Sequence, residues 1–382
     1  MLNAATYIKS WFWPSETIVH RRPDPWLWIP AAILLVLGLM MVLNTTYFLG
    51  LERTGDAFHF FKLHLIHIAV GLVVLIPLSQ FSLTGLRRIA KPLFFISAAM
   101  LILIYVPGLG AMRGGARRWL KLGPLMIEPS DLVKFALVFF LADFLSRRQE
   151  RIKSFAHGPL AVFLIAGPVA LLILKQPDFG STVMIALILF AMLFAAGARG
   201  SHLAMAGGGA AAILGVQAVA KSYRMKRLTA FLDPWAVARG AGFQLIQSFI
   251  ALGEGGEWGV GLGAGRQKMF YLPESHTDFI FAVIGEEFGL IGAGVVIALF
   301  LTILFRGMRI AHDEPDPFAS LLAAGLTCLL SIQALINIAV VIGLIPTKGL
   351  PLPFLSYGGT SIVMAMATLG ALLALARRPA VR

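Results

Sequence analysis

Long apolar stretches alternate with short polar segments along nearly the whole chain. A helix needs ~20 apolar residues to cross the hydrocarbon core of a bilayer. About ten stretches approach that length, and they lie at residues 26–48, 60–81, 88–107, 129–146, 159–174, 179–197, 202–222, 277–305, 317–345 and 356–377. Two connections are long, at residues 108–128 and 223–276. The pattern predicts an all-α fold, a polytopic membrane protein with about ten transmembrane helices.

The composition favours the same class of protein. Of the 382 residues, 58% are hydrophobic and only 13% are charged, and the mean hydropathy is +0.83. A water-soluble fold could not bury so much apolar surface. Because a bundle of membrane helices grows by adding spans, we expect a single domain over residues 1–382. Cys328 is the only cysteine, which excludes an internal disulfide and a cysteine-based metal site.

Lysine and arginine residues indicate the orientation of the helices, because short loops rich in them stay in the cytoplasm. With a cytoplasmic N-terminus, every inner connection carries positive charge: Arg21 and Arg22, then Arg87, Arg88 and Lys91, then Arg147, Arg148, Arg151 and Lys153, then Arg199, Arg306, Arg309, Arg377 and Arg378. We therefore predict cytoplasmic N- and C-termini. The long 223–276 loop, between the seventh and eighth helices, is then extracytoplasmic.

This orientation leaves many cations outside, where few are expected. They are Arg113, Arg117, Arg118, Lys121, Lys175, Arg224, Lys226, Arg227, Arg239, Arg266, Lys268 and Lys348. One explanation is that long loops cross the membrane whatever their charge. The other is an anion-binding site, and the natural anion at an outer membrane surface is a lipid-linked phosphate or a headgroup. No nucleic-acid partner is expected.

Two segments have backbones suited to lining such a site. Residues 253–265 form the most glycine-dense stretch, and glycines either let backbone amides approach a phosphate or act as a hinge. Residues 346–354 contain Pro346, Pro351 and Pro353 and cannot form a continuous helix. Non-helical backbone at membrane depth survives only beside protein or a water-filled cavity. Lys348 in this segment either meets a phosphate or anchors the chain at the interface.

Lys134 lies about one turn inside a predicted span, where an unpaired charge costs about 2.5–3.5 kcal/mol. It should therefore face water or have a carboxylate partner. Glu128 and Asp131 are the near candidates. Ser130 or Asp131 is also suited to cap the helix that follows.

The sequence from Tyr271 to Ile280 enters a span with several polar side chains in close succession. Thr277 or Asp278 as a simple helix cap is one reading. A metal site formed by Glu274, His276 and Asp278 is a second. The third is a reactive carboxylate at the outer mouth of the protein, beside the outer cations. The same span carries Glu286 and Glu287 at membrane depth, and Gly285 and Gly289 at a spacing that suits close helix packing.

A carboxylate beside a basic cavity suits one kind of sugar chemistry. If the anion is a lipid pyrophosphate that carries a sugar, a hydroxyl of a second sugar can displace it at the anomeric carbon. The attacking hydroxyl then needs a general base, and the departing pyrophosphate needs cations. Because a pyrophosphate leaves without being protonated, no second carboxylic acid is required. Asp278 is suited to the role of this general base.

Five stretches resemble the SEDS family (shape, elongation, division and sporulation proteins). They are GGARRWLKLGPLMIEPSDLVK (114–134), KQPDFGST (175–182), FQLIQSFIALGEGGEWGVGLG (243–263), QKMFYLPESHTDFIFAVIGEEFGLIG (267–292) and IPTKGLPLPFLSYGGTS (345–361). The resemblance extends over nearly the whole chain from about residue 26. It implies a ten-span peptidoglycan glycosyltransferase that polymerises lipid II on the outer face of the bacterial cytoplasmic membrane. The family's catalytic aspartate, in its HTDF motif, corresponds to Asp278.

The resemblance also implies partners and site residues. The division members of the family are matched better than the elongation members, which implies a class B penicillin-binding protein transpeptidase, other divisome membrane proteins and a place at the division septum. No organic cofactor is expected, and a divalent cation (Mg²⁺ or Mn²⁺) is left open. We predict Asp278 as the general base. The predicted substrate-binding residues are Arg113, Arg117, Arg118, Lys121, Glu128, Lys134, Arg266, Lys268, His276, Lys348 and Ser356.

Two other functions compete with the division polymerase. One is an elongation polymerase of the same family. The other is a transporter that flips lipid II, which would use Lys134, Glu286 and Glu287 as charges at membrane depth. A transporter needs charges along a path open to both sides, whereas cations concentrated outside favour chemistry on one face.

Overall fold

The computed structural model describes residues 23–113, 116–122, 125–219 and 222–377. Helices make up most of this part of the chain. They are α2 (Pro25–Thr54), α3 (His59–Leu78), α4 (Leu83–Leu103), α5 (Pro129–Ser146), α6 (Pro159–Lys175), α7 (Phe179–Ala195), α8 (Gly200–Val219), α9 (Ser222–Leu232), α10 (Phe243–Gly255), α11 (Ile280–Asp313), α12 (Pro317–Val341) and α13 (Gly359–Ala376). The predicted helical fold is confirmed.

Each predicted apolar stretch coincides with one of these helices, from α2 to α8 and from α11 to α13. Among the described residues, five helices are long and apolar enough to cross a membrane, namely α2, α3, α11, α12 and α13. The helices α6 and α7 are apolar but have only 17 residues each. Several charged residues lie within α4 and α5, which lowers their hydropathy. The multi-pass class is therefore clear, and the total of ten spans stays a prediction.

Aspartates are the N-cap residues of three helices, α2, α7 and α12. The Asp24 carboxylate accepts a hydrogen bond from the Trp26 amide (3.0 Å), and Asp178 accepts one from the Ser181 amide (3.0 Å). Asp316 caps α12 in the same way. Such caps satisfy backbone donors that the first helical turn leaves without partners.

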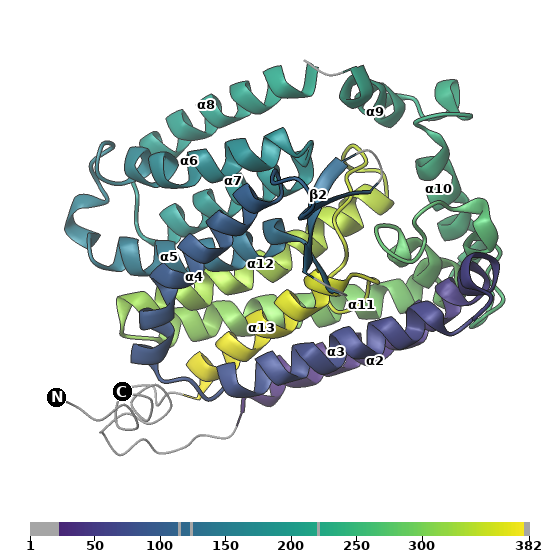
Figure 1. The fold of residues 1–382 in the computed structure, drawn as a ribbon, viewed down its shortest axis with the longest axis horizontal. Coiled ribbons are helices and arrows are strands. Elements are labelled where there is room, and N and C mark those ends of the chain that lie inside the picture. Colours follow the sequence, from purple (N-terminus) through teal and green to yellow (C-terminus); the bar gives the residue numbers. More distant parts are fainter. Residues whose placement is uncertain (1–22, 114–115, 123–124, 220–221, 378–382) are drawn as a thin grey trace.

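The long helices lie side by side along the longest axis of the molecule (Figure 1). The beginning of α2 and the end of α13 lie at one end of this bundle, as the predicted orientation requires, and α9 and α10 lie at the other end. We call the second the outer end. The helices α5 and α12 are buried on most sides and pack on each other, and α3 packs on α13 and α11 on α2.

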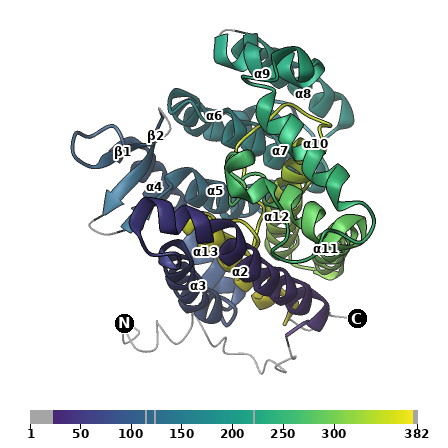
Figure 2. The same ribbon diagram turned by 90° about the vertical axis from the view of Figure 1, so that its right-hand side faces the viewer.

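A small antiparallel sheet was not anticipated in the 108–128 connection. Its strands are β1 (Gly110–Arg113), β2 (Ala116–Leu122) and β3 (Leu125–Ile127), in the order β1-β2-β3. Figure 2 shows β1 and β2 at the side of the bundle. The sheet places Arg117 and Arg118 beside the start of α5 and near the loop before α7.

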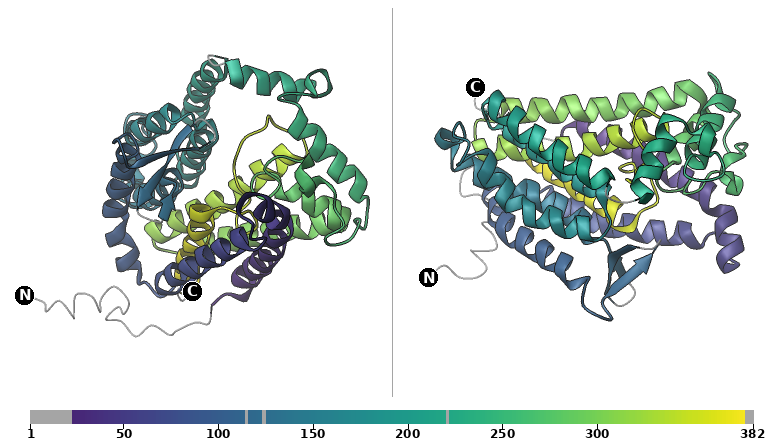
Figure 3. Two further views of the ribbon diagram at one scale, coloured as in Figure 1. Left: turned by 45° about the vertical axis from the view of Figure 1, so that its right-hand side comes forward. Right: turned by 90° about the horizontal axis from the view of Figure 1, so that it is seen from above.

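The 223–276 segment, predicted as a long loop, contains helices of its own. It contains α9, a 3-10 turn (Trp235–Val237), α10 and a π-helical turn (Gln267–Tyr271). Figure 3 shows α8, α9 and α10 arching over one side of the molecule.

The glycine-dense stretch in this segment packs against α11 where that helix is interrupted at Gly289 (φ 67°). The amides of Val260 and Gly261 donate to the carbonyls of Glu286 and Glu287, each at 3.0 Å. A Cβ on Gly289 would lie 2.4 Å from the Glu257 carbonyl oxygen, so only glycine fits. The glycine-dense stretch therefore packs closely on α11, which uses the Val260 and Gly261 amides. Gly289 was predicted to serve close helix packing, but it interrupts α11 and packs on the loop that contains Glu257.

Candidate active site

Asp278 lies in the turn that leads into α11, at the outer end of the bundle. The helix begins at Ile280, and its N-cap residue, Phe279, makes no side-chain capping bond. The Thr277 hydroxyl donates instead to the Glu274 carboxylate (2.9 Å). The reading of Thr277 or Asp278 as a simple cap is therefore wrong. The carboxylate of Asp278 is not required to start the helix.

The non-helical segment between α12 and α13, residues 342–358, packs on this turn. We call it the proline-rich segment, and its lack of helix is as predicted. The Ser356 hydroxyl donates to the Thr277 carbonyl (2.5 Å) and accepts from the Leu352 amide (2.8 Å). The Tyr357 amide donates to the His276 carbonyl (2.8 Å). Two hydrogen bonds, from Ser356 to Thr277 and from Tyr357 to His276, thus hold the two segments together.

The Asp278 carboxylate itself lies against Gly349 of the proline-rich segment. A Cβ built on Gly349 would be 2.8 Å from Oδ2 of Asp278. That is closer than real Cβ contacts allow, so the absence of a side chain makes the room that the carboxylate occupies. The proline-rich segment thus forms one wall of the site.

Burial raises the pKa of Asp278 to about 7. The nearby Glu274 carboxylate raises this pKa further, whereas the guanidinium groups of Arg227 and Arg118 lower it. Asp178 adds a smaller repulsion. The Asp278 carboxylate is therefore a stronger base than an ordinary aspartate, and two arginines lie close enough to lower its pKa.

Three cations surround the turn from separate elements. Arg118 of β2 donates to the carbonyls of Gln176 (3.1 Å) and Pro177 (2.5 Å), before α7. Arg227 of α9 donates to the Thr347 carbonyl at 3.3 Å. Lys348 lies 5.1 Å from the centre of the Phe179 ring, and burial lowers the pKa of its ammonium group. In the described part of the chain, neither Arg227 nor Lys348 forms an ion pair.

A second group of charges lies at the start of α5. Lys134 and Asp131 form a buried ion pair of 2.7 Å, which confirms the need for a carboxylate partner. Glu128 accepts a hydrogen bond from the Ser130 hydroxyl (3.0 Å). Burial raises the pKa of Glu128 to about 8, with Asp131 and Asp178 adding to the rise. Since Asp178 acts on both Glu128 and Asp278, the two groups of charges belong to one region.

Lys268, predicted to bind substrate, is instead bonded to other residues of the protein. Its ammonium group lies 2.6 Å from the Glu287 carboxylate and 2.7 Å from the Asn44 side-chain oxygen. The side chain is 2% exposed, so it is not available to a phosphate. The Glu286 carboxylate accepts hydrogen bonds from the backbone amides of Arg266 (2.6 Å) and Gln267 (3.2 Å). This cluster ties the π-helical turn to α11 and α2.

The other predicted binding residues differ in their exposure and in their neighbours. Arg117 is half-buried on β2, and Lys121 and Arg266 are exposed. The His276 ring lies 5.9 Å from the Tyr357 ring, and burial lowers the pKa of His276. Arg113 ends β1, but its side chain lies outside the described part of the structure.

Two contributors to the site were missing from the predicted site residues. In the sequence, Arg227 is one outer cation among many, although it lies on a strongly basic short helix. Asn337 is not among the predicted site residues, although a polar residue inside an apolar span is a recognised signal of function. It donates to the Asp278 carbonyl at 2.8 Å.

Metal binding by this turn has no geometric support. Within the described ranges, no group of three or more histidine, cysteine, aspartate or glutamate side chains is arranged to hold a metal ion. Glu274, His276 and Asp278 therefore do not form the site that their alternate spacing suggested.

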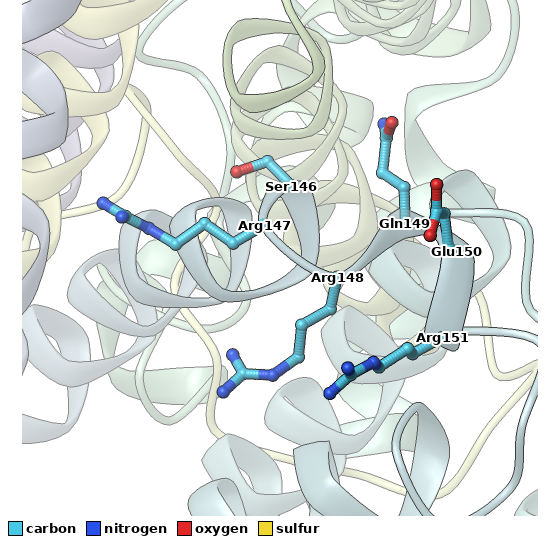
Figure 4. A pocket seen from close by; sticks show the side chains of 6 residues that line it. All are labelled: Ser146, Arg147, Arg148, Gln149, Glu150 and Arg151. Atoms are coloured by element: carbon cyan, nitrogen blue, oxygen red, sulfur yellow. The ribbon is translucent and has the colours of Figure 1, made fainter.

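A cavity of about 600 Å³ lies far from Asp278. It is lined by Ser146, Arg147, Arg148, Gln149, Glu150 and Arg151 (Figure 4). These residues follow the end of α5 that is opposite to Glu128, so the length of an 18-residue helix separates the two regions. Arg147 there is paired with Asp143 (2.9 Å). The cavity is not part of the site at the outer end.

The fold and the site together define a polytopic helical membrane protein with a high-pKa carboxyl group among cations at its outer end. The chain belongs to the FtsW/RodA/SpoVE family of cell cycle proteins, whose model matches residues 25–380. The chain is 40% identical over 358 residues to the probable peptidoglycan glycosyltransferase FtsW of Geobacter sulfurreducens, covering 94% of this chain and 96% of that one. It is also 40% identical over 362 residues to the stage V sporulation protein E of Bacillus subtilis, covering 94% and 99%.

Solved structures have the same fold. A chain from a study of the structural coordination of polymerization and crosslinking by a peptidoglycan synthase complex superimposes with a TM-score of 0.76 and 29% identity, covering 96% of this chain and 98% of that one. The rod shape determining protein RodA of Thermus thermophilus gives a TM-score of 0.66 and 25% identity, covering 93% and 97%. The resemblance inferred from the sequence motifs is confirmed.

Proposed function

We propose that this protein is a peptidoglycan glycosyltransferase that polymerises lipid II on the outer face of the membrane, with Asp278 as its general base. The observation that carries the proposal is the position of Asp278, whose carboxyl group has a pKa of about 7 and lies near Arg118 and Arg227. The relatives named as probable peptidoglycan glycosyltransferases support the same activity.

The proposed reaction joins the sugars of two lipid-linked substrates. A hydroxyl of the acceptor attacks the anomeric carbon of the donor, and Asp278 takes the hydroxyl proton as the new C–O bond forms. The bond from the anomeric carbon to the pyrophosphate breaks, and its electron pair leaves with the lipid pyrophosphate. A general base works best when its pKa lies near the operating pH, and Asp278 meets that condition.

The cations around the turn would stabilise the leaving group. Negative charge grows on the pyrophosphate as the bond breaks, and fixed cations in a partly buried site stabilise it more than water does. Lys348 and Arg227 are suited to this task because they are not committed to ion pairs in the described structure. Arg118 contributes charge to the site, although its donors are partly used by Gln176 and Pro177.

The flippase alternative loses its sequence support. Lys134 is paired with Asp131, Glu287 is paired with Lys268, and Glu286 accepts two backbone amides. These charges at membrane depth are therefore engaged with partners inside the fold. The elongation polymerase remains the second candidate because the RodA structure shares the fold.

The proposed setting is the cytoplasmic membrane of a bacterium, at the division septum. The relatives named FtsW support a division role. We propose a class B penicillin-binding protein as the crosslinking partner, together with other divisome membrane proteins. A solved relative from a complex that coordinates polymerization with crosslinking supports the transpeptidase partner.

The test is polymerisation of labelled lipid II by purified Asp278→Asn, reconstituted in vesicles with its partner. The amide keeps the shape of the side chain but cannot accept the proton, so glycan strands should not form while lipid II still binds. Asp56→Asn is the matched control, because Asp56 is an exposed aspartate paired with Lys62 (2.8 Å) on the α2–α3 turn. Polymerisation by Asp278→Asn at the rate of the control would refute the general-base role.

A further inference from the structure

Asn337 links the two segments that form the site, although it lies on neither. It belongs to the last turn and a half of α12 and is 1% exposed. Its Nδ2 group donates to the Asp278 carbonyl at 2.8 Å and to the Leu350 carbonyl at 2.7 Å. One amide therefore holds the turn that carries Asp278 and the proline-rich segment at a fixed separation.

The two acceptors determine how this amide is oriented. Both partners are carbonyl oxygens, so only the nitrogen of the side chain can face them. The amide oxygen has no hydrogen-bond partner among the described residues, and it is buried. A buried polar atom without a partner is costly, as is a polar side chain in an apolar helix. Asn337 therefore lowers the stability of the fold in these two respects, which indicates that its two hydrogen bonds serve another purpose.

The other links between the two segments do not involve a rigid element. Ser356 and Tyr357 join the proline-rich segment directly to the turn. The neighbouring polar residue of α12, Gln333, donates to the Pro351 carbonyl (2.8 Å) and so contacts only the proline-rich segment. Within the described hydrogen bonds, Asn337 is the side chain through which α12 reaches Asp278.

We propose that Asn337 is a positioning residue for Asp278, and that it fixes the Asp278 carboxylate against Gly349 at the distance needed for proton transfer. This inference rests on the proposed role of Asp278 as the general base. The Asp278 backbone carbonyl is bonded to Asn337 of a rigid helix. The carboxylate on the same residue therefore moves little during the reaction, which favours a reactive geometry.

Loss of the amide should affect turnover more than substrate affinity. Asn337→Leu keeps a side chain that branches at Cγ and removes both hydrogen bonds, so the turn is no longer tied to α12. A displacement of about 1 Å at a reacting group lowers rates by roughly 100-fold. We expect a fall of about that size in kcat. KM for lipid II should change less than about threefold, because Gln333 still ties the proline-rich segment to α12 and Arg118 keeps its bonds to Gln176 and Pro177.

The pH profile should also change. The groups that act on Asp278 are Glu274 and Asp178, which raise its pKa, and Arg227 and Arg118, which lower it. Burial is the largest cause of the raised pKa. A turn released from α12 exposes the carboxyl group to more water, so its pKa falls towards the ordinary range. The acid limb of the kcat profile should then move to lower pH.

The experiment compares Asn337→Leu with Gln333→Leu in reconstituted vesicles that contain labelled lipid II. Gln333→Leu loses a hydrogen bond of the same kind, from the same helix, but none to the Asp278 turn. We expect the fall in kcat and the displaced acid limb in Asn337→Leu only. Asn337→Ala gives the same comparison if the leucine variant does not fold.

Two results would overturn the inference. One is a kcat of the Asn337 variants within about threefold of the parent protein. The other is an equal fall in kcat and an equal shift of the acid limb in Gln333→Leu. That result would show that any bond between α12 and the proline-rich segment has this effect. Failure of the general-base proposal looks different, because Asp278→Asn would then stay active whatever the Asn337 variants do.

Discussion

The rate of polymerisation should depend on pH in a way that the environment of Asp278 determines. The base works only when it is deprotonated, and its pKa is raised to about 7 by burial. The rate should therefore be half-maximal near neutral pH. At pH 6 about one-tenth of the enzyme, and at pH 5 about one-hundredth, would carry the ionised carboxylate. An ordinary aspartate would stay almost fully ionised over that range.

A variant of Arg227 checks the assignment of this limb to Asp278. The guanidinium group lowers the pKa of Asp278, so Arg227→Gln should raise it and move the acid limb to higher pH. The plateau at alkaline pH should also fall if Arg227 stabilises the pyrophosphate. The two effects are separable because one changes the position of the curve and the other its height.

The assay is the initial rate of glycan formation from labelled lipid II in proteoliposomes, measured between pH 5 and about 9. Buffers of overlapping range and a substrate concentration well above KM separate catalysis from binding. A limb near the ordinary pKa of a carboxylic acid would refute the reasoning about burial. A limb that stays in place in Arg227→Gln would refute its assignment to Asp278.

Three further substitutions separate structure from catalysis. Lys348→Gln should lower the plateau rate by roughly 100-fold without moving the acid limb, as loss of a charge that stabilises the leaving group does; an unchanged rate would remove Lys348 from the site. Gly349→Ala should lower the rate because the new Cβ would lie 2.8 Å from the Asp278 carboxylate, and the rate is compared with that of the exposed-glycine control Gly294→Ala. Lys268→Met should lower the free energy of unfolding by about 3–5 kcal/mol by leaving Glu287 buried without its cation, measured by thermal unfolding, and an unchanged melting temperature would contradict this.

The helices were predictable because the bilayer imposes a length and a polarity on each of them. Every apolar stretch in the sequence became a helix, and Lys134 found the carboxylate partner that its depth required, Asp131. The HTDF motif identified Asp278 as the candidate base. These features depend on neighbouring residues in the chain, which a sequence shows directly.

The contacts between distant segments were not predictable in the same way. Lys268 was expected to meet a phosphate, but Glu287 and Asn44 take its donors, and Asn44 lies on a helix more than two hundred residues earlier. Ser356 was expected to bind substrate, but its hydroxyl is used by Thr277 and Leu352. A sequence gives the chemical type of each side chain, whereas the partner depends on how the helices pack.

The small sheet and the helices of the 223–276 segment were missed for a related reason. The strands around Arg118 are short, with four, seven and three residues. The helix α9 carries too many charges to appear as an apolar stretch. Both elements nevertheless bring cations to Asp278, so hydropathy alone underestimates the site.

The most direct test of the central claim is the position of a bound lipid pyrophosphate in a structure of this protein with lipid II or a non-reactive analogue. The account predicts that the pyrophosphate contacts Lys348 and Arg227 and lies near Arg118, with the anomeric carbon within about one sugar of the Asp278 carboxylate. A pyrophosphate bound at the opposite end of the bundle, or separated from Asp278 by much more than one sugar, would contradict the role of Asp278 as the base.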